Sequence, residues 1–272
     1  MKKLVSLLIL LMLGLSILPV LNAQAAEASR GKVYLLVIDK LDISQIDSSA
    51  TPSLFKIASK GAVGLASTRT LGRVGTEDEY ITIGAGNIAR EYGKGPVAYN
   101  ADELVGLTQH TGAELYRSIM GVNPGSNRCL VLNLPETLAG LSLESVTSTP
   151  GALGDVLKQN NIKVCVLGNG DTSLEKSRFG ALIAMDVYGR VPLGDVSPVF
   201  NKVDPRSSLD FVTDYDKLQT AVAKYSQQAD LMVIDLPDFT RLEKSWTGMA
   251  NAQAHQKYVI IRQMDRFAEF IL

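Results

Sequence analysis

The sequence has few of the residues that build cysteine and histidine sites. It contains two cysteines, two histidines and one tryptophan among 272 residues. It has no Cys-x-x-Cys pair and no Cys/His cluster, which argues against a cysteine-based metal or redox site. Cys129 and Cys165 could pair in an oxidising compartment. Cys165, however, lies in the mostly apolar run 162–167, and we expect buried, unpaired thiols that pack as small hydrophobic groups.

Charge of one sign and long apolar runs are also scarce. The 27 basic and 28 acidic side chains leave a net charge of −1, which gives no long-range attraction to nucleic acid or to an anionic membrane. After residue 30 no stretch is long and apolar enough to cross a bilayer. There is no G-x-S-x-G motif, which argues against an α/β-hydrolase nucleophile. The 46% hydrophobic content nevertheless suffices for a globular core.

The N-terminus has the pattern of an export signal. Two lysines precede the apolar run 4–21, which Pro19 interrupts, and Ala23-Gln24-Ala25 supplies the small-x-small pattern of a signal peptidase site. We therefore predict a signal peptide over residues 1–25 and a protein that is extracellular, periplasmic or held in the cell envelope. A retained membrane anchor is the alternative, because the run is just long enough to span a bilayer.

Strand-like and helix-like segments alternate along the rest of the chain. The run 33–38 is continuous, apolar and rich in branched residues, as in a strand buried on both faces. Helical segments between such strands predict an α/β fold with a mainly parallel sheet covered by helices on both faces. We expect one domain over 26–272, with insertions. Expected strands cover residues 33–38, 62–66, 162–167, 181–188 and 231–235, and expected helices cover 52–60, 151–161 and 215–228.

Two places in this pattern can carry chemistry. Asp39 directly follows the first strand, and open α/β sheets keep their sites at the carboxyl ends of strands. In the segment 71–89, Gly72 and Gly75 permit a tight turn before Thr76, and the acidic residues after it favour the positive first turn of a helix. A hydroxyl there has access to free backbone amides, which favour an alkoxide and a bound phosphate. Alternatively, Thr76 only caps the helix.

The same segments resemble a known superfamily. The segment 71–89, LGRVGTEDEYITIGAGNIA, is similar to the nucleophile motif of cofactor-independent phosphoglycerate mutases, Asn-Ser-Glu-x-Gly-His followed by a hydrophobic stretch and Gly-Ala-Gly. Thr76-Glu77 falls at the Ser-Glu position, and the Gly-Ala-Gly follows at the same offset. Upstream, VYLLVIDKL with TPSLFKIASKGAVG resembles the first strand, the metal-binding aspartate and the Thr-Pro-x-Leu helix that open the alkaline phosphatase superfamily.

The resemblance implies roles for individual residues. It makes Asp39 a metal ligand and Thr76 the phosphoryl-accepting nucleophile, itself bound to metal. The segment LMVIDLPDFTRLE resembles the strand that delivers an aspartate to a second metal, for which we choose Asp238 over Asp235. Arg241 is then a candidate phosphate contact, and a surface salt bridge is the alternative for it. Asn169 is a candidate to line the cleft, with an Asx turn as the alternative.

The family pattern is incomplete. In the mutases the second aspartate begins an Asp-x-x-x-His pair, but here Leu242 occupies the histidine position, and neither His110 nor His255 stands in the pattern of the later ligands. Two explanations stay open. The sheet is incomplete because the chain is a fragment, which we favour, or the chain is a degenerate member that binds a phosphorylated ligand or a partner without turnover.

The sequence therefore predicts an exported scaffold for a metal-dependent phosphoesterase or phosphoryl-transfer hydrolase. The resemblance implies a divalent metal, Zn or Mn, with two ions in a complete family member. The expected substrate is a phosphorylated small molecule or an envelope-derived compound, with no nucleic acid and no stable membrane span after signal cleavage. A catalytically silent envelope protein that binds ligand or assembles through the same cleft is the rival hypothesis.

Overall fold

The structure, a computed structural model, describes most of the chain after the N-terminal segment. Residues 32–272 form one compact unit. The predicted signal peptide lies outside the described residues. The structure describes residues 31–66, 69–71, 75–93, 98–107, 109–205, 207, 209–245 and 249–272.

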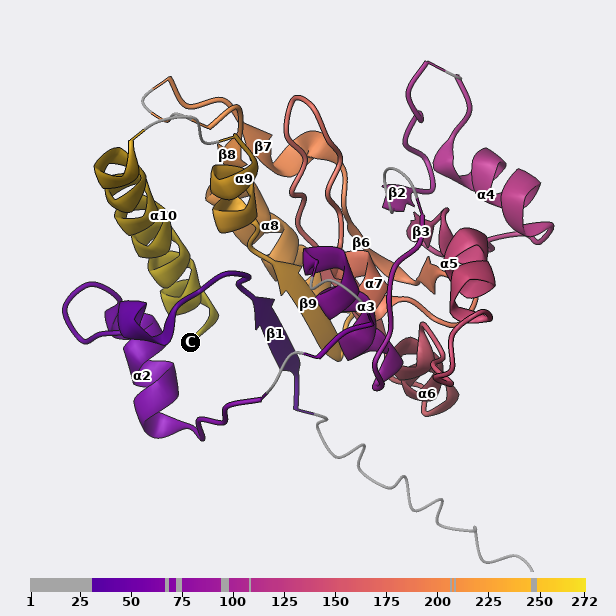
Figure 1. The fold of residues 1–272 in the computed structure, drawn as a ribbon, viewed down its shortest axis with the longest axis horizontal. Helices are drawn as coiled ribbons and strands as arrows, with labels where there is room; N and C mark the ends of the chain where they lie inside the picture. The colour runs from indigo at the N-terminus through magenta and orange to yellow at the C-terminus, as the bar shows by residue number, and fades with distance from the viewer. Residues whose placement is uncertain are drawn as a thin grey trace, which may run out of the picture. The chain divides into compact units, whose positions relative to one another are not determined.

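A four-stranded parallel sheet organises this unit (Figure 1). The strand order is β1-β9-β4-β6, and each neighbouring pair runs parallel. All four strands therefore end at the same edge of the sheet, where α/β folds place their sites. The bounds are β1 (Val33–Val37), β9 (Leu231–Asp235), β4 (Val164–Leu167) and β6 (Leu193–Asp195).

Helices cover both faces of this sheet, as the sequence predicts. Met232 and Ile234 of β9 pack into one hydrophobic cluster, and Val233 packs into another on the opposite face. Successive side chains of a strand point to opposite faces of the sheet, so a strand made only of apolar residues needs cover on both faces. The first cluster includes residues of α2 (Pro52–Lys60), α8 (Tyr215–Ser226), α9 (Asp238–Ser245) and α10 (Ala250–Ile271). The second includes residues of α3 (Thr76–Ala85) and α7 (Gly180–Ala184), with side chains of α6 (Ala152–Gln159) packed against it.

Smaller elements lie beyond this core. A three-stranded antiparallel sheet has the order β2-β3-β5, and β7 pairs with β8. Cys129 and Cys165 are both buried and unpaired, as predicted. Within the described residues no helix is long and apolar enough to traverse a membrane. The remaining bounds are η1 (Ile43–Gln45), β2 (Ala98–Asn100), α4 (Gly112–Met120), β3 (Cys129–Val131), α5 (Leu134–Leu141), β5 (Arg190–Val191), η2 (Pro198–Phe200), β7 (Asn201–Lys202) and β8 (Val212–Thr213).

Two of the expected strands are wrong. The run 181–188 is not a strand, because residues up to Ala184 belong to the buried helix α7. Close packing accompanies this helix: Gly84 of α3 lies so near α7 that a methyl group on it would be 2.2 Å from the carbonyl oxygen of Leu182. The segment 62–66 is irregular, and Leu65 is 89% exposed there.

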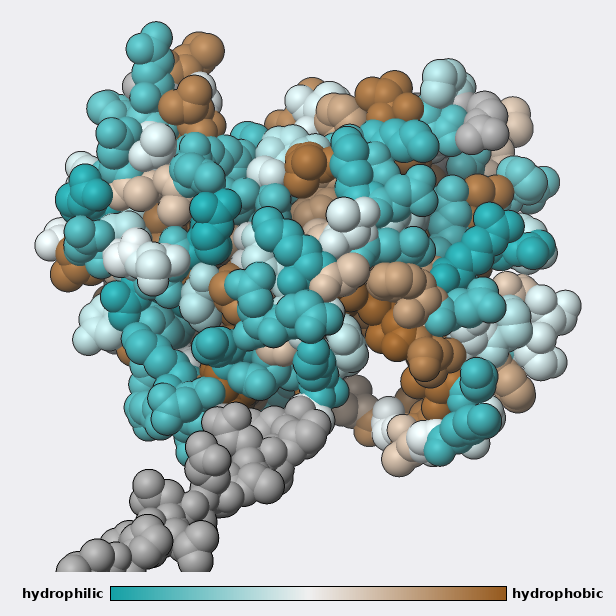
Figure 2. All heavy atoms as spheres, turned by 180° about the vertical axis from the view of Figure 1, so that it is seen from behind, coloured by the Kyte–Doolittle hydropathy of each residue, from teal (hydrophilic) through white to brown (hydrophobic). Residues whose placement is uncertain are grey.

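Strand β1 forms one edge of the sheet and is less covered than its neighbours. Its residues are exposed or half-buried, whereas those of β4 are all buried. In Figure 2, which shows the molecule from behind, apolar side chains gather on the side where Figure 1 places α2, β1 and the C-terminal end of α10. Exposed apolar side chains on these elements include Val33, Phe55, Ile57, Phe270 and Leu272.

Candidate functional site

Asp39 lies just beyond the carboxyl end of β1 and is an unusual buried acid. Its side chain is 8% exposed, and neither carboxylate oxygen has a hydrogen-bond partner among the described residues. Burial raises the pKa of Asp39 to about 7, and the negative charges of Asp235 and Glu79 add to this effect while Lys40 opposes it. An unpartnered buried carboxylate is costly to keep ionised, so a bound cation would relieve it.

Asp235 is the second acid at this edge. It ends β9 and pairs in register with Val37 of β1, two residues before Asp39. The hydroxyl of Tyr80 on α3 donates a 2.7 Å hydrogen bond to Asp235 Oδ1. Burial raises the pKa of Asp235 to about 6, although the hydrogen bond from Tyr80 works in the opposite direction. Two carboxylates from adjacent strands therefore share one electrostatic environment beneath α3.

Thr76 is the first residue of α3, as the sequence predicts. Gly75 is the N-cap, with an extended backbone and no side-chain cap, so Thr76 itself does not cap the helix. The first helical hydrogen bond runs from the Glu79 amide to the Gly75 carbonyl at 3.1 Å. The three preceding amides of the helix, those of residues 76–78, have no partner among the described residues. They form the open helix N-terminus that favours an anion.

The same helix links Thr76 to the two aspartates. Glu79 lies three residues after Thr76 and raises the pKa of Asp39, while Tyr80 bonds to Asp235. Within the described part of the chain, no hydrogen bond or ion pair joins Thr76 directly to Asp39. The first turn of α3 and the ends of β1 and β9 thus belong to one region of the molecule.

Asp238, by contrast, already has a full set of partners. Its Oδ1 accepts hydrogen bonds from the amide and hydroxyl of Thr213 at 3.0 and 2.9 Å, and its Oδ2 accepts one from Tyr215 at 3.1 Å. Arg241 completes the set with a 2.6 Å ion pair, and the Asp238 side chain is fully buried. A metal at Asp238 would have to displace these donors. The role of Asp238 as a metal ligand therefore stays a prediction, and this arrangement disfavours it.

Arg241 is buried rather than available to a phosphate. Its five N–H donors all have acceptors: the carbonyls of Asp171 and Asn169, Thr213 Oγ1, Asp238 Oδ1 and Asn201 Oδ1. Both readings from the sequence, a phosphate contact and a surface salt bridge, therefore differ from the structure. The guanidinium instead joins α9 to the loop that follows β4 and to strands β7 and β8.

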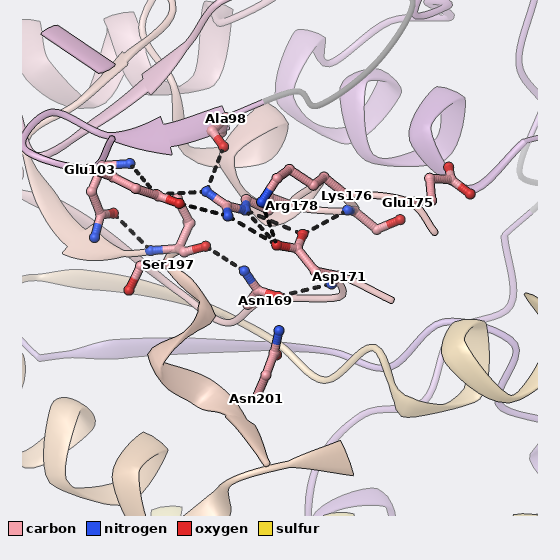
Figure 3. A network of polar contacts seen from close by, with 12 residues as sticks. Ala98, Glu103, Asn169, Asp171, Glu175, Lys176, Arg178, Ser197 and Asn201 are labelled. Atoms are coloured by element: carbon pink, nitrogen blue, oxygen red, sulfur yellow. Dashed lines mark hydrogen bonds and ion pairs between the residues drawn. The ribbon is translucent and has the colours of Figure 1, made fainter. Parts of the chain in front are cut away.

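Asn169 also has a structural partner for each end of its amide. Its Oδ1 accepts from the Asp171 amide at 2.8 Å, which is the Asx turn proposed as the alternative, and its Nδ2 donates to the Val196 carbonyl at 2.7 Å. Figure 3 shows the adjoining network, in which the fully buried Arg178 contacts Glu103 and Asp171 with two charged hydrogen bonds or more to each. These contacts hold the loops of this region in position.

The chemistry of the site suits a hard cation better than zinc. The two aspartates and the Thr76 hydroxyl offer only oxygen, which Mn²⁺ or Mg²⁺ accepts, whereas Zn²⁺ prefers histidine and cysteine. His110 lies on the surface beside Glu114, and His255 lies on the exposed face of α10. Among the described residues, no three histidine, cysteine or acidic side chains form a ready metal cluster. Two carboxylates and one hydroxyl, with water in the remaining positions, are enough ligands for one ion and too few for a two-metal centre.

Sequence reasoning preferred Asp238 to Asp235, and it missed Glu79 and Tyr80. The sequence does contain a signal for Asp235, because this residue stands at the end of a continuous apolar strand, and Asp39 directly follows another such run. Glu79 and Tyr80 lie in the segment that resembles the nucleophile motif, but a helix can turn either residue toward the sheet, and sequence alone does not fix which. Comparison with protein-family models, with curated proteins and with solved structures gave no match for this chain.

Proposed function

We propose that this chain is the scaffold of a metal-dependent phosphoesterase with an alkaline-phosphatase-like core, in which Asp39 and Asp235 hold one hard divalent cation and Thr76 accepts the phosphoryl group. The observation that carries this proposal is the Asp39 carboxylate, buried without a partner beside a second acid at the strand ends. The open amides of α3 supply the complementary site for a phosphate. Asp235 replaces Asp238 in this assignment because Asp238 is already saturated.

The chain's own residues would share the work of phosphoryl transfer. A cation at this site would lower the pKa of a nearby hydroxyl and neutralise charge on the substrate. The Thr76 oxygen would then attack phosphorus as the ester P–O bond breaks, and the proton of Thr76 would pass through water to the leaving alkoxide. Attack by water on phosphorus would later break the Thr76 ester and release phosphate. The amides of the first turn of α3 would hold the non-bridging oxygens, where negative charge concentrates.

Phosphate-ester turnover tests the role of Thr76. With Mn²⁺ and 4-nitrophenyl phosphate, Thr76→Ala should reduce turnover by at least about a hundredfold, because the variant has no hydroxyl to accept the phosphoryl group. Thr76→Ser should retain part of the activity because the hydroxyl stays. Thr220→Ala, at an exposed position of α8, is the matched control. Undiminished turnover by folded Thr76→Ala would exclude the nucleophile role.

A silent binding protein is the second candidate. It is favoured by one observation, the lack of a third histidine, cysteine or acidic ligand among the described residues. On this alternative the region around Asp39, Asp235 and Thr76 serves ligand binding or assembly in the envelope. Metal titration separates the two, because a folded sample without affinity for manganese or zinc would favour the silent protein.

Location and partners are part of the same proposal. The lysines, apolar run and small-x-small pattern over 1–25 support export to the envelope or beyond it. The expected ligand is a phosphorylated small molecule or an envelope-derived ester, because the site offers a helix N-terminus and a place for a cation rather than an extended basic surface.

A further inference from the structure

A cavity lies at the opposite end of the sheet from the aspartates. It has a volume of about 260 Å³ and reaches the amino end of β4, where Val164 begins the strand. Asp39 and Asp235 follow the carboxyl ends of parallel neighbours, so the two places are separated by the length of the strands. The lining residues are Asn127, Gly154, Lys158, Asn161, Ile162, Lys163, Val164, Ala184, Asp186, Arg190 and Pro192.

Cations outnumber acids in this lining. Lys158, Lys163 and Arg190 face a single carboxylate, that of Asp186. Asp186 is buried and accepts from Lys158 at 3.0 Å and from Arg190 at 2.9 Å. Although burial opposes ionisation of Asp186, the hydrogen bonds from Arg190 and Lys158 keep its pKa below the usual value. Its negative charge therefore persists at neutral pH but does not offset all the cations around it.

Lys163 is the third cation of this lining, and it is not paired with Asp186. Its backbone amide donates to the Asp230 carboxylate at 2.8 Å, and its carbonyl accepts from the amides of Asp230 and Leu231. Its ammonium group makes no hydrogen bond or ion pair with any residue that the structure describes. A charged group beside a cavity, without a protein partner, is a ready contact for an anionic ligand.

The remaining walls are aliphatic. Ile162, Val164, Ala184 and Pro192 line the cavity with carbon, and Val164 and Ala184 are buried. Gly154 of α6 lets the helix backbone lie against α7, since a methyl group there would be 2.2 Å from the Met185 carbonyl oxygen. Lys163, which also lines the cavity, is exposed. Mostly apolar walls with a few polar groups are the usual composition of a small-molecule site.

We propose that this cavity binds a small monoanion with an aliphatic body, such as a medium-chain carboxylate, with Lys163 paired to the carboxylate. A free phosphate or polyphosphate suits it less well, because two of its three cations already hold Asp186 and most of its wall is apolar. The volume also lies below the range usual for drug-sized ligands and nucleotides. This site is independent of the proposed phosphoesterase function.

Calorimetric titration of the full chain with octanoate tests the proposal. The wild type should bind octanoate, and Lys163→Gln should weaken binding about tenfold, the loss expected for one charge-assisted contact. Lys56→Gln, at an exposed position of α2, is the matched control and should leave the affinity unchanged. Ile162→Trp should also weaken binding, because its larger ring fills the cavity from the rim.

Two results would overturn this assignment. Absence of octanoate binding by the folded wild type would remove the site altogether. Equal affinity in wild type and Lys163→Gln, or equal binding of the uncharged octanol, would show that the cavity does not select a monoanion through Lys163. Thermal unfolding of each variant establishes that it is folded, so that weaker binding by Lys163→Gln reports on the contact itself.

Discussion

The buried Asp39 carboxyl should make the metal-free protein lose stability as pH rises. Its pKa is about 7 in the folded chain and 3.8 in the unfolded reference. Between these values the folded state holds a proton that the unfolded state has released, so the free energy of unfolding falls as pH increases. This rise of about three in the pKa corresponds to a loss of at most about 4 kcal/mol in the free energy of unfolding. Most of this loss should fall between about pH 4 and pH 7.

Asp39→Asn should remove the part of this dependence that Asp39 contributes. Urea unfolding in a chelator at pH 5 and pH 8 should show a smaller fall in the free energy of unfolding for the variant than for the wild type, and the part left in the variant is that of Asp235, whose pKa is also raised, to about 6. The asparagine amide also lacks partners, which costs about 1 to 3 kcal/mol at both pH values and so cancels from the difference. Asp42→Asn, at an exposed position after β1, is the control. Parallel pH dependence in wild type and Asp39→Asn would refute the reasoning.

Three further predictions concern packing and the sheet edge. Gly84→Ala should lower the free energy of unfolding by about 1 to 3 kcal/mol, because its methyl group would strike α7; an unchanged urea midpoint would contradict this. Arg178→Met should cost about 3 to 5 kcal/mol, because two carboxylates lose their buried partner; a loss below about 1 kcal/mol would argue against it. In hydrogen exchange, the outward amides of Tyr34 and Leu36 should exchange faster than that of Met232, and equal protection would disprove a free β1 edge.

The basis of the hydrogen-exchange prediction is the register of the parallel ladder. The Val33 amide donates to Asp230, and the Val37 carbonyl accepts from Leu236, so the odd-numbered residues of β1 point toward β9. Tyr34 and Leu36 therefore present their amides and carbonyls to the open side of the sheet. Met232 belongs to β9, which has a bonded neighbour on each side.

The core of the fold could be predicted because its pattern is local. The runs at β1, β4 and β9 are continuous and apolar, and each lies near a helix with clear start and stop residues, such as Pro52 at the first turn of α2. The strand expected over 181–188 failed for a different reason. Short apolar runs fit a strand or a buried helix equally well, and contact with Gly84, far away in sequence, decides in favour of the helix.

The site was predictable only in part. Asp39 and Thr76 could be selected because a strand end and a helix start are visible in sequence. The choice between Asp235 and Asp238 could not be made from the sequence, because both lie at the end of the same strand. Only the tertiary partners of Asp238 show that its hydrogen-bonding capacity is already used. The burial of Arg241 likewise depends on loops that are distant in sequence.

The central claim is that the carboxylates of Asp39 and Asp235 share one hard cation. Crystals grown at pH 8 with Mn²⁺, measured at the manganese absorption edge, test it most directly. The account predicts one anomalous peak within about 2.5 Å of an oxygen from each aspartate, the distance range of hard-cation ligands, and its loss in Asp39→Asn. Ordered, protein-bound manganese elsewhere, with both carboxylates unoccupied, would contradict it.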